Sequence, residues 1–178
     1  MKRISLIILL ALITNLAAFA QTAPVVTKAG IKFQIKNLGI NTGGTIGGVK
    51  ATIHFDPAQL ATSTIEATAD VATIFTDNDE RDTHLKSADF FEVQRYPRIT
   101  MRSVAFKRKS GANYVGTFNV TIKDKTKQLD VPFTYTENGN TAAFTGTLKL
   151  NRLDFGVGGS SLVLSNDVTA TITVELNK

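Results

Sequence analysis

Apolar and polar residues alternate along most of the chain from residue 31 onward. A period of two is typical of strands that bury one face and expose the other. The clearest run is the last, where Ala170, Ile172 and Val174 alternate with threonines. Such runs occur at residues 31–35, 49–55, 65–71, 99–101, 114–122, 129–135, 144–150 and 168–176. The pattern therefore predicts eight strands, preceded by a loose tail at residues 21–30.

Turn-forming residues separate these runs, at residues 41–44, 56–57, 110–111, 123–125 and 138–139. Short strands joined by tight turns are typical of an antiparallel sandwich or barrel. Full closure hides both edges of a sheet, which would otherwise expose unpaired backbone groups. We therefore predict an all-β fold, an eight-stranded antiparallel barrel.

Two predicted connections are long, at residues 75–97 and 151–166. The first has acidic residues at its start and then Leu85, Phe90 and Phe91, a pattern that favours one or two short helices. The second is rich in Gly and Ser. Successive turns of an up-and-down barrel alternate between its ends, so both connections are expected at the same mouth. Loops of this length are usually functional or disordered.

Composition narrows the chemistry that this protein can perform. The 178 residues include no cysteine, which excludes disulfides and cysteine nucleophiles. With only two histidines, few ligands are available for a metal site. No nucleophile and base are suitably arranged, so we predict neither an enzyme nor a cofactor. The formal net charge is +5, and the basic runs at 107–109 and 123–127 are expected at opposite ends of the barrel. This separation argues against nucleic-acid binding.

The N-terminus has the layout of a secretory signal peptide. Lys2 and Arg3 precede an apolar run at residues 4–13, and an A-x-A cleavage site follows at residues 18–20. The run is about half of the ~20 apolar residues that a spanning helix needs, although an uncleaved anchor is the alternative. We predict a signal peptide at residues 1–20, a single mature domain at 21–178, and no stable membrane insertion.

The inward face of the predicted barrel is aliphatic and aromatic, with almost no charge. Two interpretations remain open, a solid core and a cavity for a long apolar ligand. Small residues on this face leave volume that larger neighbours need not fill. They are Ala51, Ala67, Ala69, Gly116, Gly146 and Ala170.

Short motifs in and around the two long connections have the order and spacing of a known family. They are Thr76, Asn78, Arg81-Asp82, His84-Leu85, Ser87-Ala88-Asp89-Phe90-Phe91, Tyr96-Pro97, Ile99, Thr121-Ile122-Lys123, Thr126-Lys127, Asn151-Arg152, Asp154-Phe155-Gly156 and Asp167-Val168. On these motifs residues 29–177 resemble the YceI-like proteins, a bacterial group of exported lipocalin-like barrels described as polyisoprenoid-binding. The chain departs from the family pattern at Asp124, where Gly is usual, and at Met101, where an aromatic residue is common. Asp tolerates a left-handed turn better than most residues, so we expect the hairpin to survive.

The resemblance implies a barrel that holds an isoprenoid or another long-chain amphiphile, for sequestration or carriage. The alternative is a structural or stress-related interaction module whose barrel is filled by its own side chains. The resemblance also implies an exported protein of the periplasm, or a secreted one. A homodimer is compatible with the sequence but not required by it.

The expected ligand-binding residues are of three kinds. The wall residues are Met101, Phe118, Val120, Phe133, Phe144, Leu148, Ile172 and Val174. Phe90 and Phe91 either gate the lumen or plug the barrel end. Arg81 and Arg152 either meet a hydroxyl or phosphate head group, as the planar guanidinium is suited to do, or pair with Asp82 or Asp154 and pin the loops.

Overall fold

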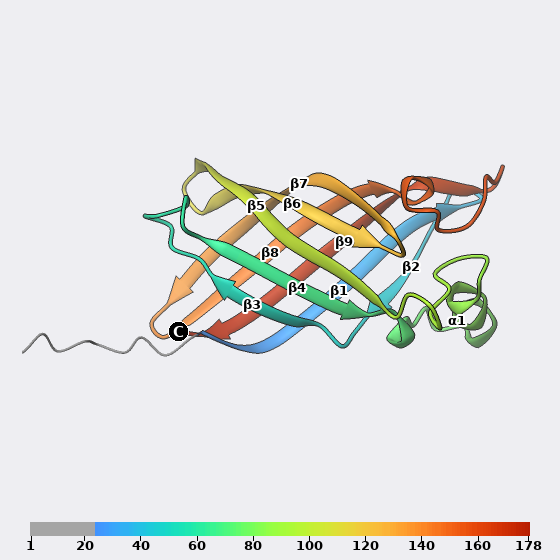
Figure 1. Ribbon diagram of the computed structural model, residues 1–178, viewed down its shortest axis with the longest axis horizontal. Helices are drawn as coiled ribbons and strands as arrows, with labels where there is room; N and C mark the ends of the chain where they lie inside the picture. The colour runs from blue at the N-terminus through green and yellow to red at the C-terminus, as the bar shows by residue number, and fades with distance from the viewer. Residues whose placement is uncertain (1–23) are drawn as a thin grey trace, which may run out of the picture.

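The computed structural model describes residues 24–178, which form nine strands in one antiparallel sheet that curls into a barrel (Figure 1). The strands are β1 (Val25–Asn37), β2 (Ile40–Ile46), β3 (Lys50–His54), β4 (Thr64–Asp70), β5 (Arg98–Ser110), β6 (Asn113–Ile122), β7 (Lys125–Asn138), β8 (Thr141–Asn151) and β9 (Leu164–Asn177). The helical segments are α1 (Asp79–Lys86) and the 3-10 turns η1 (Val71–Thr73) and η2 (Arg152–Phe155). The predicted fold class is confirmed, including a short helix in the 75–97 connection. The predicted signal peptide lies outside the described residues.

The strand order is β2-β1-β9-β8-β7-β6-β5-β4-β3, so the two edge strands of the sheet are consecutive in the chain. Residues 40–54 therefore run along the seam of the barrel. Their first half pairs with β1 and their second half with β4. The predicted second strand is β3, and β2 is the strand by which the structure exceeds the predicted eight.

The seam is held by backbone hydrogen bonds around a glycine bend. The Asp70 amide donates to Gly47 O at 3.1 Å, and Thr45 and Phe75 exchange two backbone bonds of 2.8 and 3.0 Å. Gly48 has a φ of +61°, and a Cβ there would lie 2.6 Å from Asp70 Cβ. A side chain at residue 48 would therefore separate the two halves of the seam.

Three local predictions were wrong. Residues 41–44 belong to strand β2 and not to a turn, because Gly43 and Gly44 allow close approach to the backbone oxygens of Phe33 and Phe75. The turn comes earlier, at Leu38-Gly39. Residues from 25 onward are not a loose tail, because β1 pairs with β9 from its first residue. The β6–β7 hairpin forms as expected, since Ile122 pairs with Lys125, but its left-handed residue is Lys123, with a φ of 57°, and not Asp124.

Aromatic side chains fill one end of the barrel. The ring of Phe55 lies 4.9–5.6 Å from five other rings, all in edge-to-face geometry, which is a favourable arrangement for aromatic pairs. Gly116 makes room for this packing, since a Cβ there would overlap the ring of Phe118. We call this group the aromatic plug, made of Phe55, Phe106, Tyr114, Phe118, Phe133, Tyr135 and Phe144.

The opposite end carries the long connections, as the topology predicted. Helix α1, the β1–β2 hairpin and the loop after η2 lie together there (Figure 1). Lys123, in the β6–β7 turn, donates from Nζ to Phe90 O at 2.9 Å and to Gly156 O at 3.2 Å. One lysine therefore ties both long connections to the same end of the barrel, which we call the mouth.

Candidate ligand-binding cavity

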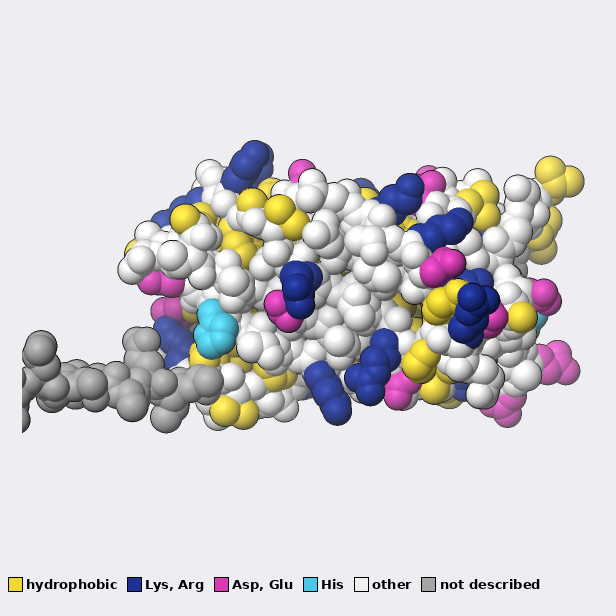
Figure 2. Space-filling model, in the orientation of Figure 1, with side chains coloured by type: hydrophobic (Ala, Val, Ile, Leu, Met, Phe, Trp, Pro, Cys, Tyr) yellow, Lys and Arg dark blue, Asp and Glu magenta, His cyan; other side chains and the backbone are white. Residues whose placement is uncertain are grey.

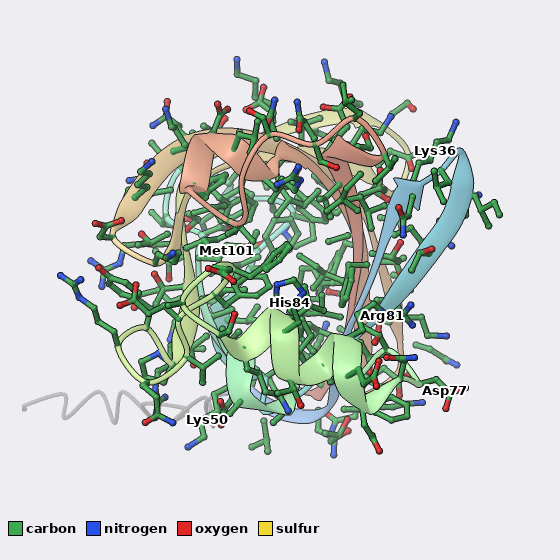
Figure 3. The ribbon with its side chains drawn as sticks, turned by 90° about the vertical axis from the view of Figure 1, so that its right-hand side faces the viewer. Lys36, Lys50, Asp77, Arg81, His84 and Met101 are labelled. Atoms are coloured by element: carbon green, nitrogen blue, oxygen red, sulfur yellow. The ribbon has the colours of Figure 1, made fainter. Side chains whose placement is uncertain are left out.

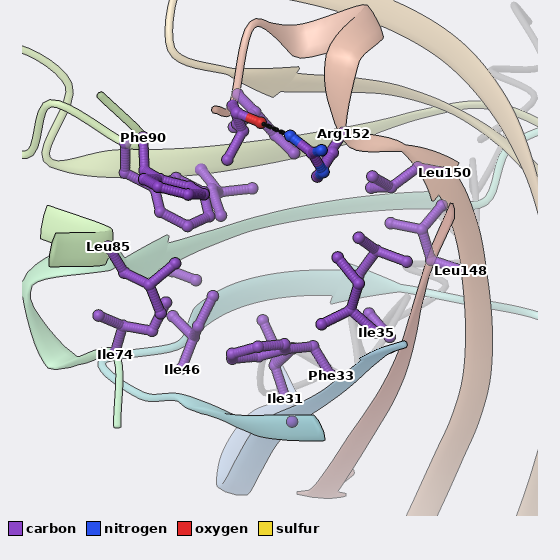
Figure 4. A pocket seen from close by; sticks show the side chains of 18 of the residues that line it. Ile31, Phe33, Ile35, Ile46, Ile74, Leu85, Phe90, Leu148, Leu150 and Arg152 are labelled. Carbon is purple, nitrogen blue, oxygen red and sulfur yellow. Dashed lines mark hydrogen bonds between the residues drawn. The ribbon is translucent and has the colours of Figure 1, made fainter. Parts of the chain in front are cut away.

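A cavity of about 430 Å³ lies between the mouth and the interior of the barrel (Figure 4). Its volume is within the range of small-molecule binding sites in proteins. Strands β1, β2, β4, β5, β6, β8 and β9 supply its wall, and α1 with the two long connections lies over its open end (Figure 3). The barrel interior is thus solid at one end and hollow at the other.

Strand alternation and small residues together produce the hollow half. Ile31, Phe33 and Ile35 of β1 all point inward, and Phe33 pairs across the sheet with Ala170. Ala170 pairs in turn with Leu148 on its other side. The inward Ala67, Ala69 and Ala170 line the cavity, so at these positions volume is left open as expected. Ala51, Gly116 and Gly146 do not line it, and at the two glycines side chains such as Phe118 and Val131 take up the space.

Helix α1 places apolar side chains over the mouth. Asn78 begins the helix by accepting a hydrogen bond from the Arg81 amide at 2.8 Å, and acidic residues fill the first turn, where the helix dipole favours them. The helix ends at Lys86, and the Phe91 amide donates back to Leu85 O at 3.1 Å. This return brings Leu85, Phe90 and Phe91 to the cavity. A movable gate over the cavity and a fixed cover of the barrel end would both use these three side chains.

Arg152 is the buried charge of the site, with 3% of its surface exposed. Its Nε donates to Ser165 O and its Nη1 to Val157 O, both at 2.9 Å, while Nη2 reaches Asn166 Oδ1 at 3.3 Å. These bonds fix the loop after η2 against the barrel, and Figure 4 draws the one to Val157 O as a dashed line. Burial lowers the pKa of Arg152 from its ordinary value, although arginine remains charged in proteins.

Arg81 is exposed, and its side chain forms hydrogen bonds only within the connection at residues 75–97. Its Nε donates to Thr76 Oγ1 at 2.8 Å and its Nη2 to Thr76 O at 2.6 Å. The buried Asp82 accepts from the amide and the hydroxyl of Thr76 at 2.9 and 2.5 Å. Within residues 24–178 neither Arg81 nor Arg152 forms an ion pair, so the predicted pairs with Asp82 or Asp154 are absent. The loops are pinned by hydrogen bonds to neutral groups.

The cavity lining is apolar and has a positive end. Among the described residues that line it, Arg81, Arg152 and His84 can carry positive charge and none carries a carboxylate. His84 stacks edge-to-face on Phe90 with 4.9 Å between ring centroids. No group of three or more His, Asp or Glu side chains in residues 24–178 could hold a metal ion. The arrangement can therefore hold an apolar chain and present cations and N–H donors to its polar end.

The sequence also matches a known protein family. The YceI-like domain family matches residues 23–176, almost the whole described chain.

The chain belongs to the YceI-like family.

YceI-like relatives are similar to it along most of their length. A UPF0312 protein of Pseudomonas syringae pv. tomato is 32% identical over 151 residues, which is 79% of each chain. The crystal structure of BcnA from Burkholderia cenocepacia has a TM-score of 0.79 at 27% identity, and the match covers 83% of this chain and 95% of BcnA. A polyisoprenoid-binding domain from Saccharophagus degradans shares the fold, with a TM-score of 0.66 at 10% identity over 88% of this chain and 99% of that domain.

Most of the residues expected in this YceI-like site do lie at the cavity. They are Arg81, Phe90, Phe91, Met101, Val120, Leu148, Arg152, Ile172 and Val174. Phe118, Phe133 and Phe144 do not, because they belong to the aromatic plug. Strand parity places a side chain on the inner face, but it does not say at which height along the barrel the interior is hollow.

Sequence reasoning missed part of the lining. Gly43 was missed because it lies in the predicted turn at residues 41–44, and Ile46 because it lies between that turn and the predicted strand at 49–55. Val157 and Val163 lie in a loop without any periodic pattern. Ile31, Phe33 and Ile35 could have been found, since their alternation predicts the same inner face.

Proposed function

We propose that this YceI-like protein is an exported carrier or store for an isoprenoid or another long-chain amphiphile. The observation that carries the proposal is the cavity of about 430 Å³ with its apolar wall. Burying an apolar chain stabilises a complex by about 25 cal/mol per Å² before the entropic costs of binding. The protein acts by binding, without covalent chemistry. The polyisoprenoid-binding domain of Saccharophagus degradans, which shares the fold, supports this ligand class.

The amphiphile enters chain-first in this proposal, with its polar end near Arg81 and Arg152. The apolar wall and the absence of carboxylates from the described lining support this orientation. The aromatic plug closes the other end and so limits how far the chain reaches. Cleavage of residues 1–20 and export to the periplasm, or secretion, complete the proposal. No helix in the described part of the chain is long and apolar enough to cross a membrane.

Native mass spectrometry of protein isolated from the cell, followed by organic extraction, tests the proposal. We expect a co-purifying isoprenoid or fatty-chain lipid. The variant Ala170→Phe places a ring in the cavity, and excluding roughly 60 Å² of apolar contact weakens binding about tenfold. Thr171→Phe is the matched control, because Thr171 neighbours Ala170 on β9 but is exposed on the outer face. Equal lipid retention in the two variants, or protein that stays empty with added polyprenol, contradicts the proposal.

A further inference from the structure

An apolar surface stands beside the cavity at the mouth of the barrel. The β1–β2 hairpin and the loop after η2 meet there, and the Leu38 amide donates to Val163 O at 2.8 Å. Leu38 is 72% exposed, Ile40 70% and Val163 48%, while Leu162 is fully exposed. We call these four residues the mouth tip. Figure 2 shows hydrophobic side chains standing out at this end of the molecule.

The mouth tip lies within two segments that contain no charged residue, 37–46 and 155–166. The charges of the mouth lie beside these segments. Lys36 is exposed on the first strand of the hairpin (Figure 3), Asp154 and Asp167 flank the second segment, and further acidic residues lie on α1. Clustered exposed apolar side chains without charges among them mark an interaction surface for an apolar partner.

The conformation of Leu38 shows that the hairpin itself does not call for a leucine. Leu38 and Gly39 have φ values of 51° and 78°, which is the left-handed pair of a two-residue hairpin turn. Asn-Gly is the favoured sequence for such a turn, because Asn tolerates a positive φ and Leu does not. The turn therefore gives no structural reason for a leucine at this position, which points to a role of its exposed side chain outside the fold.

The mouth tip is continuous with the cavity wall. Val163 is half-exposed and also lines the cavity, together with Asn37, Thr42 and Gly43 of the hairpin. A partner that covers the tip would therefore lie against the cavity opening. A hydrocarbon surface is the partner that matches both the uncharged tip and the apolar wall behind it.

We propose that the mouth tip inserts into the surface of a lipid bilayer, so that the cavity opens directly onto the membrane. The inference rests on the proposed lipid-binding function and names where the ligand is exchanged. Leu38, Ile40, Leu162 and Val163 enter the acyl region, and Lys36 lies at the level of the phosphate groups. An amphiphile then passes between membrane and cavity without exposing its chain to water.

A tryptophan at the tip tests this directly, because the chain contains none. Leu162→Trp is expected to shift its fluorescence to the blue when vesicles of phosphatidylcholine and phosphatidylglycerol are added. Val104→Trp is the matched control, since Val104 is 52% exposed on strand β5, away from the tip, and its emission should not change. Both variants carry the same N-terminus, so a difference between them reports the tip alone.

Leu38→Asn separates membrane contact from folding. Asn suits the left-handed turn, so the melting temperature should stay the same or rise. Because one leucine side chain fewer would enter the bilayer, vesicle binding should weaken about tenfold, as measured by sedimentation with the vesicles. Vesicle binding that is unchanged in Leu38→Asn overturns the proposal.

The remaining outcomes distinguish this inference from the proposed function. If the protein carries lipid in its cavity but the emission of the Leu162→Trp variant does not change with vesicles, the proposed function stands and the proposed membrane docking is wrong. Protein that never carries lipid but still shows the shift keeps the docking and overturns the function. A blue shift that grows with protein concentration without vesicles assigns the tip to a second copy of the chain and overturns the bilayer.

Discussion

Replacing Phe55 by alanine is expected to lower the free energy of unfolding by about 3 kcal/mol, as measured by urea denaturation. Five edge-to-face ring pairs converge on Phe55, and its removal would leave a void that the surrounding strands cannot close. Phe55 is only half-buried, so the expected loss lies at the lower end of the range for buried phenylalanines.

Phe75→Ala is the control for this prediction. The Phe75 side chain is 54% exposed, and the backbone bonds that it makes to Thr45 at the seam survive the substitution. Its effect should stay within about 0.5 kcal/mol. Equal losses in the two variants would mean that the aromatic plug does not hold this end of the barrel together.

Arg152→Met should destabilise the protein by about 2–4 kcal/mol, because buried acceptors left without a donor cost about 1–3 kcal/mol each. The carbonyl oxygens of Val157 and Ser165 lose the bonds of 2.9 Å that hold the loop after η2. Burial of a cation without a carboxylate is itself unfavourable, so its removal offsets part of this loss. Thermal unfolding measures the net effect.

Arg81→Met is the comparison for Arg152, because Arg81 is exposed and bonds only to Thr76. We expect it to reduce stability by less than about 1 kcal/mol. Lipid retention separates the roles of the two arginines. A head-group role predicts loss of lipid with little change in melting temperature, whereas a pinning role predicts loss of stability first. Arg152→Met with unchanged stability would contradict the role that its hydrogen bonds indicate.

Alternation allowed most strands to be predicted, because a half-buried strand leaves a period of two in the sequence. Strand β2 was not predicted, because its Gly43-Gly44 pair is also typical of a turn. The structure uses these glycines for close contact with the backbones of residues 33 and 75. The bend at Gly48 then separates β2 from β3, the strand that the alternation predicted at residues 49–55. Composition alone does not distinguish a glycine that turns the chain from one that admits a neighbour.

The candidate site was predictable in its location and less so in its details. Topology brought both long connections to one mouth, and Lys123 confirms it by binding to each of them. The solid and hollow halves share the same inward alternation, so Phe133 and Leu148 could not be separated by sequence. One of the two alternatives for Arg152 was an ion pair with an acidic neighbour, but the residue is held by backbone carbonyls. Such acceptors occur at every residue and leave no sequence signature.

The most direct test of the account is a crystal structure of the protein with a polyprenol bound. We expect continuous chain density that enters under α1, passes Ala170 and stops before the aromatic plug at Phe133 and Phe144. The polar end should lie near Arg81 and Arg152. A polyprenol bound only on the outer surface, or a cavity closed by its own side chains, would contradict the central claim that this half of the barrel is hollow in order to hold a lipid chain.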